Sequence, residues 1–193
     1  MRPGWATPRR RTAPEGDLEV FGADEQSDID IDVGRWTALA RSVLVAQGVH
    51  GDVELAVLFV DEPSMAALNA QFMEVDEPTD VLAFPIDDDV VEMGRWPDAS
   101  TTGPDRAPVE PDDAPLLLGD VVICPSVAAR NAPDHAGTID DELGLLVVHG
   151  VLHVLGMDHA ELDDRQAMQA KERELLVRFH GPPARDPWTE PAP

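Results

Sequence analysis

Residues 149–159 read H-G-V-L-H-V-L-G-M-D-H and carry three of the six histidines of the chain, His149, His153 and His159. If this stretch is helical, His149 and His153 share one face, with Cβ atoms roughly 5–6 Å apart. Gly156 is expected to end the helix, so that the chain can turn and bring His159 to the same point. The sequence therefore predicts that three imidazoles hold one zinc ion and leave a fourth position open for water, as in catalytic zinc sites.

A purely structural role for these histidines is the alternative. Residues 143–157 are apolar almost throughout, which predicts a helix buried in the core. A single histidine in such a helix is usually a hydrogen-bonded core residue. Three imidazoles in one apolar segment favour the metal site, because each buried ring would otherwise need a polar partner of its own.

The histidines and Gly156 match the spacing of the extended zinc-protease signature H-E-x-x-H-x-x-G-x-x-H. Gly150 stands where that signature has the glutamate that acts as general base. We therefore expect no peptide hydrolysis by the usual zinc-protease route. A bound metal ion could still supply a nucleophile for a substrate with an anionic leaving group.

Composition indicates one small, strongly acidic domain. The 193 residues include 38 acidic and 14 basic ones, a net charge of −24, and 43% are hydrophobic. No run reaches the ~18 apolar residues of a membrane span, and the lone Cys124, expected at the end of a buried strand, fits a reducing compartment. We therefore predict a cytoplasmic protein with no membrane partner. Acidic surfaces repel phosphate backbones, so we expect no DNA partner, and RNA binding only through local arginines or basic partner proteins.

Hydrophobic periodicity predicts alternating strands and helices. Strands are expected at residues 17–21, 53–60, 79–84 and 116–124, and helices at 34–47, 63–72, 125–130, from Thr138 to Leu155, and 161–179. This order favours an α+β fold in which helices pack on a small mixed sheet and the ligand-bearing helix is buried.

Three segments are expected to lie outside this core. Residues 1–16 hold four arginines and three prolines and predict a disordered N-terminal extension, with a basic arm for nucleic acid as the alternative. An acidic, proline-rich loop is expected at about 87–115. Residues 179–193 are predicted to form a proline-rich tail that is frayed.

Three blocks follow one another along the chain: N-A-Q-F-M-E-V-D-E-P-T-D-V-L-A-F-P at residues 69–85, L-G-D-V-V-I-C at 118–124 and V-V-H-G-V-L-H-V-L-G-M-D-H at 147–159. In this order and spacing, the chain resembles the YbeY family of bacterial endoribonucleases over roughly residues 17–178. The resemblance implies a zinc-dependent, single-strand-specific endoribonuclease that acts in 16S ribosomal RNA 3′-end maturation, rRNA processing and ribosome quality control. It also implies a core related to the zinc proteases, one zinc ion per chain on the three histidines, and the small ribosomal subunit or its proteins as partners.

One residue departs from the family pattern. Many members carry an arginine, thought to help bind or cleave RNA, five residues before the proline of the P-T-[DN]-V-L block, and this chain has Met73 there. Arg130, on the short helix after the L-G-D strand, is the candidate phosphate contact in its place. The general base is not readable from the sequence.

Several further side chains have two possible roles. Asp80 and Asp158 could accept the second N–H of a ligand imidazole, or could be turn or capping residues. Ser126 is expected to start a helix rather than act as a nucleophile. Two other functions stay open: a non-catalytic ribosome assembly factor with a structural zinc, and a metal-dependent hydrolase of a small molecule. The open coordination position favours catalysis.

Overall fold

The computed structural model describes residues 17–86, 115–157 and 162–189. The predicted N-terminal extension, nearly all of the acidic loop, and His159 with its neighbour Asp158 lie outside these ranges. In chain order the elements are β1 (Leu18–Asp24), α1 (Val33–Ala46), β2 (Val53–Phe59), α2 (Glu62–Met73), β3 (Val81–Pro85), β4 (Leu116–Ile123), α3 (Pro125–Asn131), a 3-10 turn (Ala132–Asp134), α4 (Ile139–Val154) and α5 (Leu162–Phe179). Each expected helix and strand is present, with bounds that differ by a few residues.

The four strands form one mixed sheet in the order β1-β2-β4-β3. β1 is parallel to β2 and β2 to β4, whereas the short edge strand β3 runs antiparallel to β4. The predicted α+β fold, a small mixed sheet packed with helices, is therefore confirmed. Its relation to the zinc-protease core stays a prediction.

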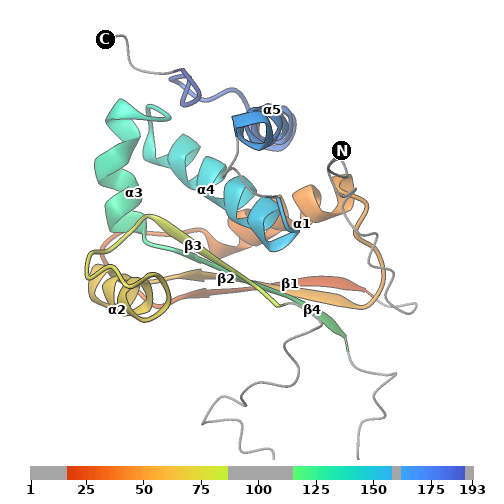
Figure 1. Ribbon diagram of the computed structural model, residues 1–193, viewed down its shortest axis with the longest axis horizontal. Helices are drawn as coiled ribbons and strands as arrows, with labels where there is room; N and C mark the ends of the chain where they lie inside the picture. Colours follow the sequence, from red (N-terminus) through yellow and green to blue (C-terminus); the bar gives the residue numbers. More distant parts are fainter. Residues whose placement is uncertain (1–16, 87–114, 158–161, 190–193) are drawn as a thin grey trace, which may run out of the picture.

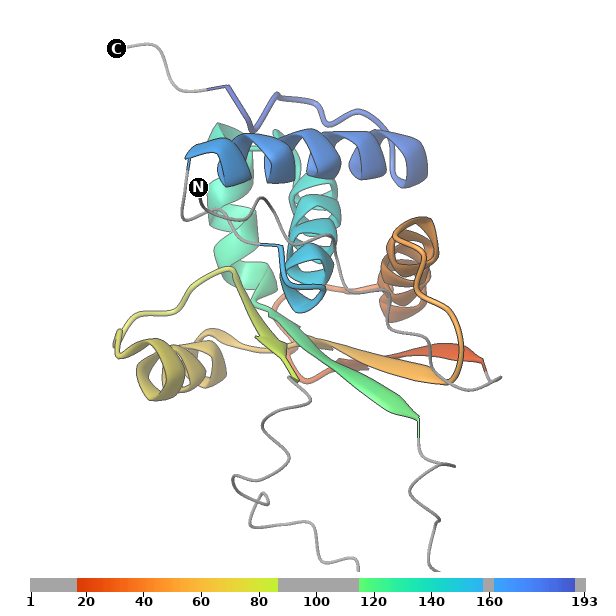
Figure 2. The same ribbon diagram turned by 45° about the vertical axis from the view of Figure 1, so that its right-hand side comes forward.

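Helices cover the two faces of the sheet unequally. α1 and α4 lie on one face with α5 outside them, while α2 lies on the opposite face (Figure 1). A turn of 45° shows α5 crossing above α4 (Figure 2). The larger core fills the space between the sheet and α1, α4 and α5, and a smaller cluster around Met65, Leu82 and Val122 lies on the α2 side. Of the helices described, none is long and apolar enough to cross a membrane.

The sequence fixes both ends of α4. The Thr138 hydroxyl caps the first turn by accepting a hydrogen bond from the Asp141 backbone N–H at 3.1 Å. At the other end Gly156, with φ of +86°, donates from its N–H to the carbonyl of His153, and Met157 donates to that of Leu152. This is a Schellman motif, which needs a left-handed residue after the helix. The prediction that Gly156 ends the helix is confirmed.

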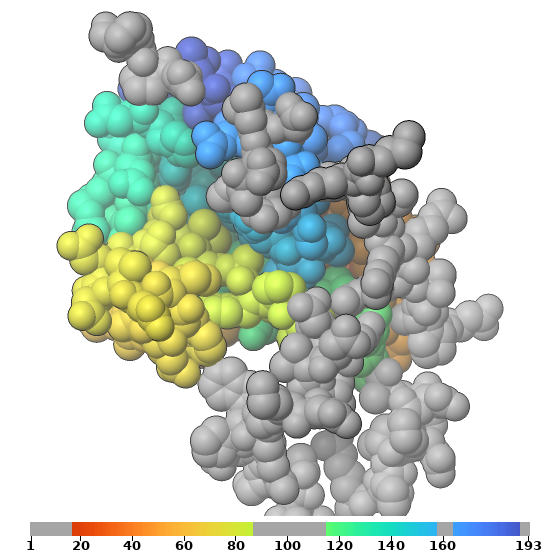
Figure 3. Space-filling view, viewed as in Figure 1, coloured from red at the N-terminus to blue at the C-terminus, as the bar shows by residue number. Residues whose placement is uncertain are grey.

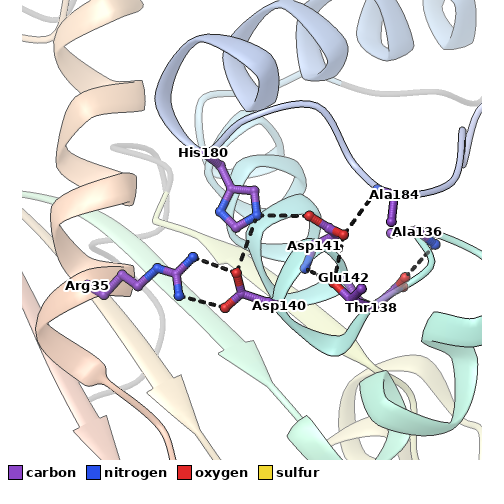
Figure 4. Close-up of polar contacts among 8 residues, drawn as sticks. All are labelled: Arg35, Ala136, Thr138, Asp140, Asp141, Glu142, His180 and Ala184. Atoms are coloured by element: carbon purple, nitrogen blue, oxygen red, sulfur yellow. Dashed lines mark hydrogen bonds and ion pairs between the residues drawn. The ribbon is translucent and has the colours of Figure 1, made fainter.

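The first turn of α4 forms polar contacts with α1 and with the segment that follows α5. Asp140 accepts two hydrogen bonds of 2.6 Å from Arg35 of α1. Asp141 lies 3.2 Å from the His180 Nε2 and accepts a hydrogen bond of 3.1 Å from the Ala184 N–H (Figure 4). Three acidic residues in this turn face the positive end of the helix dipole, which stabilises the helix.

The expectation that the C-terminal tail is frayed is wrong for residues 181–189. Besides Ala184, the Arg185 N–H donates to the carbonyl of Ala136 at 2.9 Å, and Arg173 forms an ion pair with Asp186 at 3.1 Å. This segment lies beside α3 and α5 at one end of the molecule (Figure 3). Prolines predict a lack of regular structure, but they do not prevent the other backbone groups from finding acceptors on the folded domain.

Candidate metal centre and pocket

His149 and His153 point to the same side of α4. Their ring centroids are 4.5 Å apart and the ring planes meet at 74°. Both side chains are only partly buried, although most of α4 is fully buried. The predicted pairing of these two imidazoles on one helix face is confirmed, and two imidazoles this close suit the binding of one cation.

Glu172 of α5 orients the first of these rings. The Nδ1 of His149 lies 2.6 Å from the Glu172 Oε1, and Glu172 is 5% exposed. A carboxylate only accepts hydrogen bonds, so this contact places the proton on Nδ1 and the lone pair of His149 on Nε2. This is the usual arrangement of a metal-binding histidine whose second nitrogen is held by a carboxylate.

The third predicted ligand, His159, falls outside the described residues. Residues 17–86, 115–157 and 162–189 contain no group of three His, Cys, Asp or Glu side chains that could hold a metal ion. The donor chemistry of His149 and His153, with Glu172 behind His149, fits a zinc site that needs one more ligand. The triad therefore stays a prediction.

A pocket of about 390 Å³ opens beside His149, between α4, α5 and the start of β3. Leu145, Leu146 and Met168 form apolar parts of its wall. Its polar lining consists of Asp80, His135, His149, Arg165, Gln169 and Glu172. A small pocket with an apolar wall and several converging polar groups is the usual form of a substrate site.

His135 adds a titratable group to this pocket. Its Nδ1 lies 2.8 Å and 3.0 Å from the two oxygens of Glu142, and Glu142 is fully buried at the start of α4. The hydrogen bond to Glu142 raises the pKa of His135, while burial of the ring opposes the shift. The imidazolium form of His135 therefore persists to higher pH than that of an ordinary histidine.

Arg165 differs from most arginines of the described chain. Arg35 and Arg130 have their guanidinium groups occupied by the carboxylates of Asp140 and Glu62. Arg165 is exposed at the pocket, and within the described residues no ion pair involves it. It is thus a cation at the pocket whose hydrogen-bond donors can meet an anionic ligand.

A family model described as Endoribonuclease YbeY matches residues 22–180. The chain belongs to the YbeY family. A relative named Endoribonuclease YbeY from Mycolicibacterium vanbaalenii is 42% identical over 154 residues, which cover 80% of this chain and 77% of the relative. A relative of the same name from Acidothermus cellulolyticus is also 42% identical, with 80% and 87% covered.

A solved structure shows the same fold. The solution structure of TM1509 from Thermotoga maritima matches with a TM-score of 0.50 and 23% sequence identity, and the match covers 89% of this chain and 100% of that chain. At this identity the likeness concerns the fold alone. The resemblance to the YbeY family that the three sequence blocks indicated is confirmed by the family model and the relatives.

Arg130, the candidate phosphate contact, does not line the pocket, and neither does Met73, which stands in place of the family arginine. Arg130 forms its ion pair with Glu62 at the start of α2, and Met73 is 51% exposed at the end of α2. The role of Arg130 as a phosphate contact stays a prediction. Arg165, which sequence reasoning missed, lies at the pocket instead.

Asp80 lines the pocket, but its hydrogen bonds go elsewhere. It accepts from the Asn131 amide at 3.1 Å and from the Thr79 hydroxyl at 3.3 Å. The structure thus gives the orienting role toward His149 to Glu172, and Asp80 joins β3 to α3. Asp158, the other candidate, lies outside the described residues.

Two possible nucleophiles lie away from the pocket. Ser126 is in the first turn of α3 and donates to Asp28 at 3.1 Å. Cys124 is fully buried directly after β4, and burial raises the pKa of its thiol. The expectations of a helix-start serine and a buried cysteine are confirmed.

The sequence holds one signal for Glu172. Met168, Leu175 and Leu176 are buried on α5, and Glu172 falls on the same stripe at helical spacing. A carboxylate on a buried stripe needs donors to be stable there. The identity of those donors, His149 on another helix and Trp188 beyond the end of α5, is set by tertiary packing.

Proposed function

We propose that this chain is a zinc-dependent endoribonuclease specific for single strands, which acts in the cytoplasm on ribosomal RNA. Its place would be in 16S 3′-end maturation, in other rRNA processing and in ribosome quality control, with the small ribosomal subunit or its proteins as partners. The observation that carries the proposal is the pair His149 and His153 beside a pocket, with Glu172 fixing the His149 ring. Membership of the YbeY family supports RNA as the substrate.

His149, His153 and the predicted third ligand His159 would hold the metal ion. When bound, zinc supplies a Lewis acid for a phosphate oxygen and lowers the pKa of a water molecule. Glu172 keeps His149 in the tautomer and orientation that the site requires.

The remaining pocket residues act on the phosphate group. Arg165 offers a planar fork of N–H donors to phosphate oxygens. The raised pKa of His135 favours its imidazolium form, which offers a further N–H donor while Glu142 balances its charge. Leu145, Leu146 and Met168 form an apolar wall beside these groups, and an apolar surrounding strengthens electrostatic contacts.

The net charge of −24 limits how tightly isolated RNA can bind. Each neutralised phosphate contributes about −0.7 to the slope of log affinity against log salt for single strands. A few local cations therefore predict weak binding with a shallow slope. We propose that basic ribosomal proteins help to bring the substrate to the enzyme.

The proposal is tested by cleavage of single-stranded RNA by purified protein, with and without chelator, and by elemental analysis. Wild-type protein should contain about one zinc per chain and cleave RNA in a chelator-sensitive way, whereas His153→Ala should lose zinc because two imidazoles hold it poorly. Full zinc content in His153→Ala would contradict the ligand assignment. Zinc without any RNA cleavage would instead indicate an assembly factor with a structural metal.

A parallel assay addresses the relation to zinc proteases. Because Gly150 replaces the protease glutamate, we expect no hydrolysis of casein-like substrates by the same preparation. Chelator-sensitive proteolysis by homogeneous protein would contradict this expectation. Mapping the ends of the RNA products distinguishes attack by water from attack by the RNA 2′-hydroxyl, since the two routes leave different termini.

A further inference from the structure

One buried carboxylate connects the C-terminal segment to the candidate metal site. Glu172 Oε1 lies 2.6 Å from the His149 Nδ1, and Glu172 Oε2 accepts a hydrogen bond of 2.8 Å from the Trp188 indole Nε1. His149 belongs to α4, Glu172 to α5, and Trp188 to the segment after α5. The three side chains form a single hydrogen-bonded series.

Trp188 is itself held in place by its neighbours. Its backbone N–H donates to Asp186 at 3.0 Å, and Asp186 forms an ion pair with Arg173 of α5. The Arg173 guanidinium lies over the Trp188 ring, 4.7 Å from its centroid. These contacts fix the indole in position to donate to Glu172.

Both oxygens of Glu172 therefore have a donor, which matters because the residue is only 5% exposed. A buried acceptor that loses its donor is destabilised. Without the indole N–H, one of the two hydrogen bonds that fix the carboxylate would be lost, and only the contact with His149 would remain of the pair. The orientation of the His149 ring would then be less restricted.

We propose that Trp188 is a positioning residue of the metal site, which acts through Glu172 on His149. The proposal rests on the proposed function in one respect, namely that His149 binds zinc. It assigns to the C-terminal segment a role in metal affinity, in addition to any role in stability.

The test is the zinc dissociation constant, measured by competition with a chromophoric chelator on full-length protein. Trp188→Phe keeps an aromatic ring and removes only the donor. We expect its zinc dissociation constant to rise about three- to tenfold, less than the 10–100-fold typical for loss of a direct partner of a ligand. Trp36→Phe, the same substitution at a buried site on α1, should lower the melting temperature without changing the zinc dissociation constant.

Two further variants distinguish a positioning role of Trp188 from a folding defect. Asp186→Ala removes the support of Trp188 at a half-exposed position and should weaken zinc binding in the same direction by a smaller factor. In a Glu172→Gln background, Trp188→Phe should not weaken zinc binding further, because the path to His149 is already changed. A purely structural role of Trp188 would lower the melting temperature and leave every zinc dissociation constant unchanged.

The outcomes separate this inference from the proposed function. Wild-type protein that binds no zinc would overturn both. Wild-type zinc binding with an unchanged dissociation constant in Trp188→Phe and Asp186→Ala would overturn the inference alone. A rise in the dissociation constant of Trp36→Phe equal to that of Trp188→Phe would also overturn it, since the effect would then follow from stability.

Discussion

Gly150 of α4 lies so close to Val121 of β4 that a Cβ on the glycine would stand 2.4 Å from the valine Cγ1. Position 150 therefore faces the sheet, whereas His149 next to it faces the pocket. A glutamate introduced there would be directed at the sheet. The sequence suggested that Gly150 marks a missing general base, and the structure adds that the glycine allows close packing of helix on strand.

Gly150→Ala should lower the free energy of unfolding by about 1–3 kcal/mol, the usual cost of overpacking a core. Val121 is fully buried and cannot move aside easily. Denaturant unfolding measures the change. Gly34→Ala is the matched control, because a Cβ there meets only the Asp32 side chain at an ordinary 3.5 Å, and it should be neutral or stabilising.

The contact itself is isolated by a double-mutant cycle. Val121→Ala removes the methyl groups that a Cβ at position 150 would strike. The combined Gly150→Ala and Val121→Ala variant should therefore lose less stability than the sum of the two single losses. Strict additivity would show that Gly150 is needed for another reason.

Glu172→Gln should weaken zinc binding about 10–100-fold, the range reported for partners that orient a ligand histidine. An amide is a weaker acceptor than a carboxylate and places a donor where Trp188 also donates. The zinc dissociation constant of the purified variant checks this. Glu174→Gln, at an exposed position of the same helix, should bind zinc like the wild type. Equal zinc dissociation constants in the wild type, Glu172→Gln and Glu174→Gln would show that Glu172 does not orient a zinc ligand.

Arg165→Ala should reduce both RNA affinity and RNA cleavage while zinc content stays unchanged. Loss of one phosphate contact should make the slope of log affinity against log salt shallower by about 0.7. Arg178→Ala removes an equal charge from the last turn of the same helix, so it controls for net charge. If both variants bind RNA equally well, Arg165 makes no specific contact with the phosphate.

Arg130 and Met73 provide a second pair of variants. Arg130→Ala is predicted to reduce cleavage with zinc content unchanged, although the ion pair with Glu62 makes us expect a smaller effect than for Arg165→Ala. Met73→Arg should raise cleavage if the arginine of the family pattern acts through phosphate charge. Cleavage rates and zinc content are measured side by side. Wild-type rates in both variants would place the RNA-contacting surface elsewhere.

Apolar patterning predicted the elements well because each strand and helix has a face buried in the core. The end of α4 was also readable, since Gly156 supplies the left-handed residue that the turn requires. The polar contacts of the site were not readable. Glu172 and His149 are 23 positions apart in the sequence. Their side chains come into contact because of the angle at which α5 crosses α4, and the apolar pattern does not predict that angle.

The last prediction concerns pH and the pair of His135 and Glu142. The hydrogen bond to Glu142 raises the pKa of His135 in the folded protein above its ordinary value of about 6.5. A raised folded-state pKa contributes stability that is fully present below the unfolded pKa and is lost as pH rises through the folded pKa. Wild-type protein should therefore lose more unfolding free energy between about pH 6 and about pH 9 than His135→Asn does. The difference between the two proteins reports on the pair of His135 and Glu142, because the other titratable groups are common to both. Parallel pH profiles of wild type and variant would show that the pair does not raise the pKa of His135.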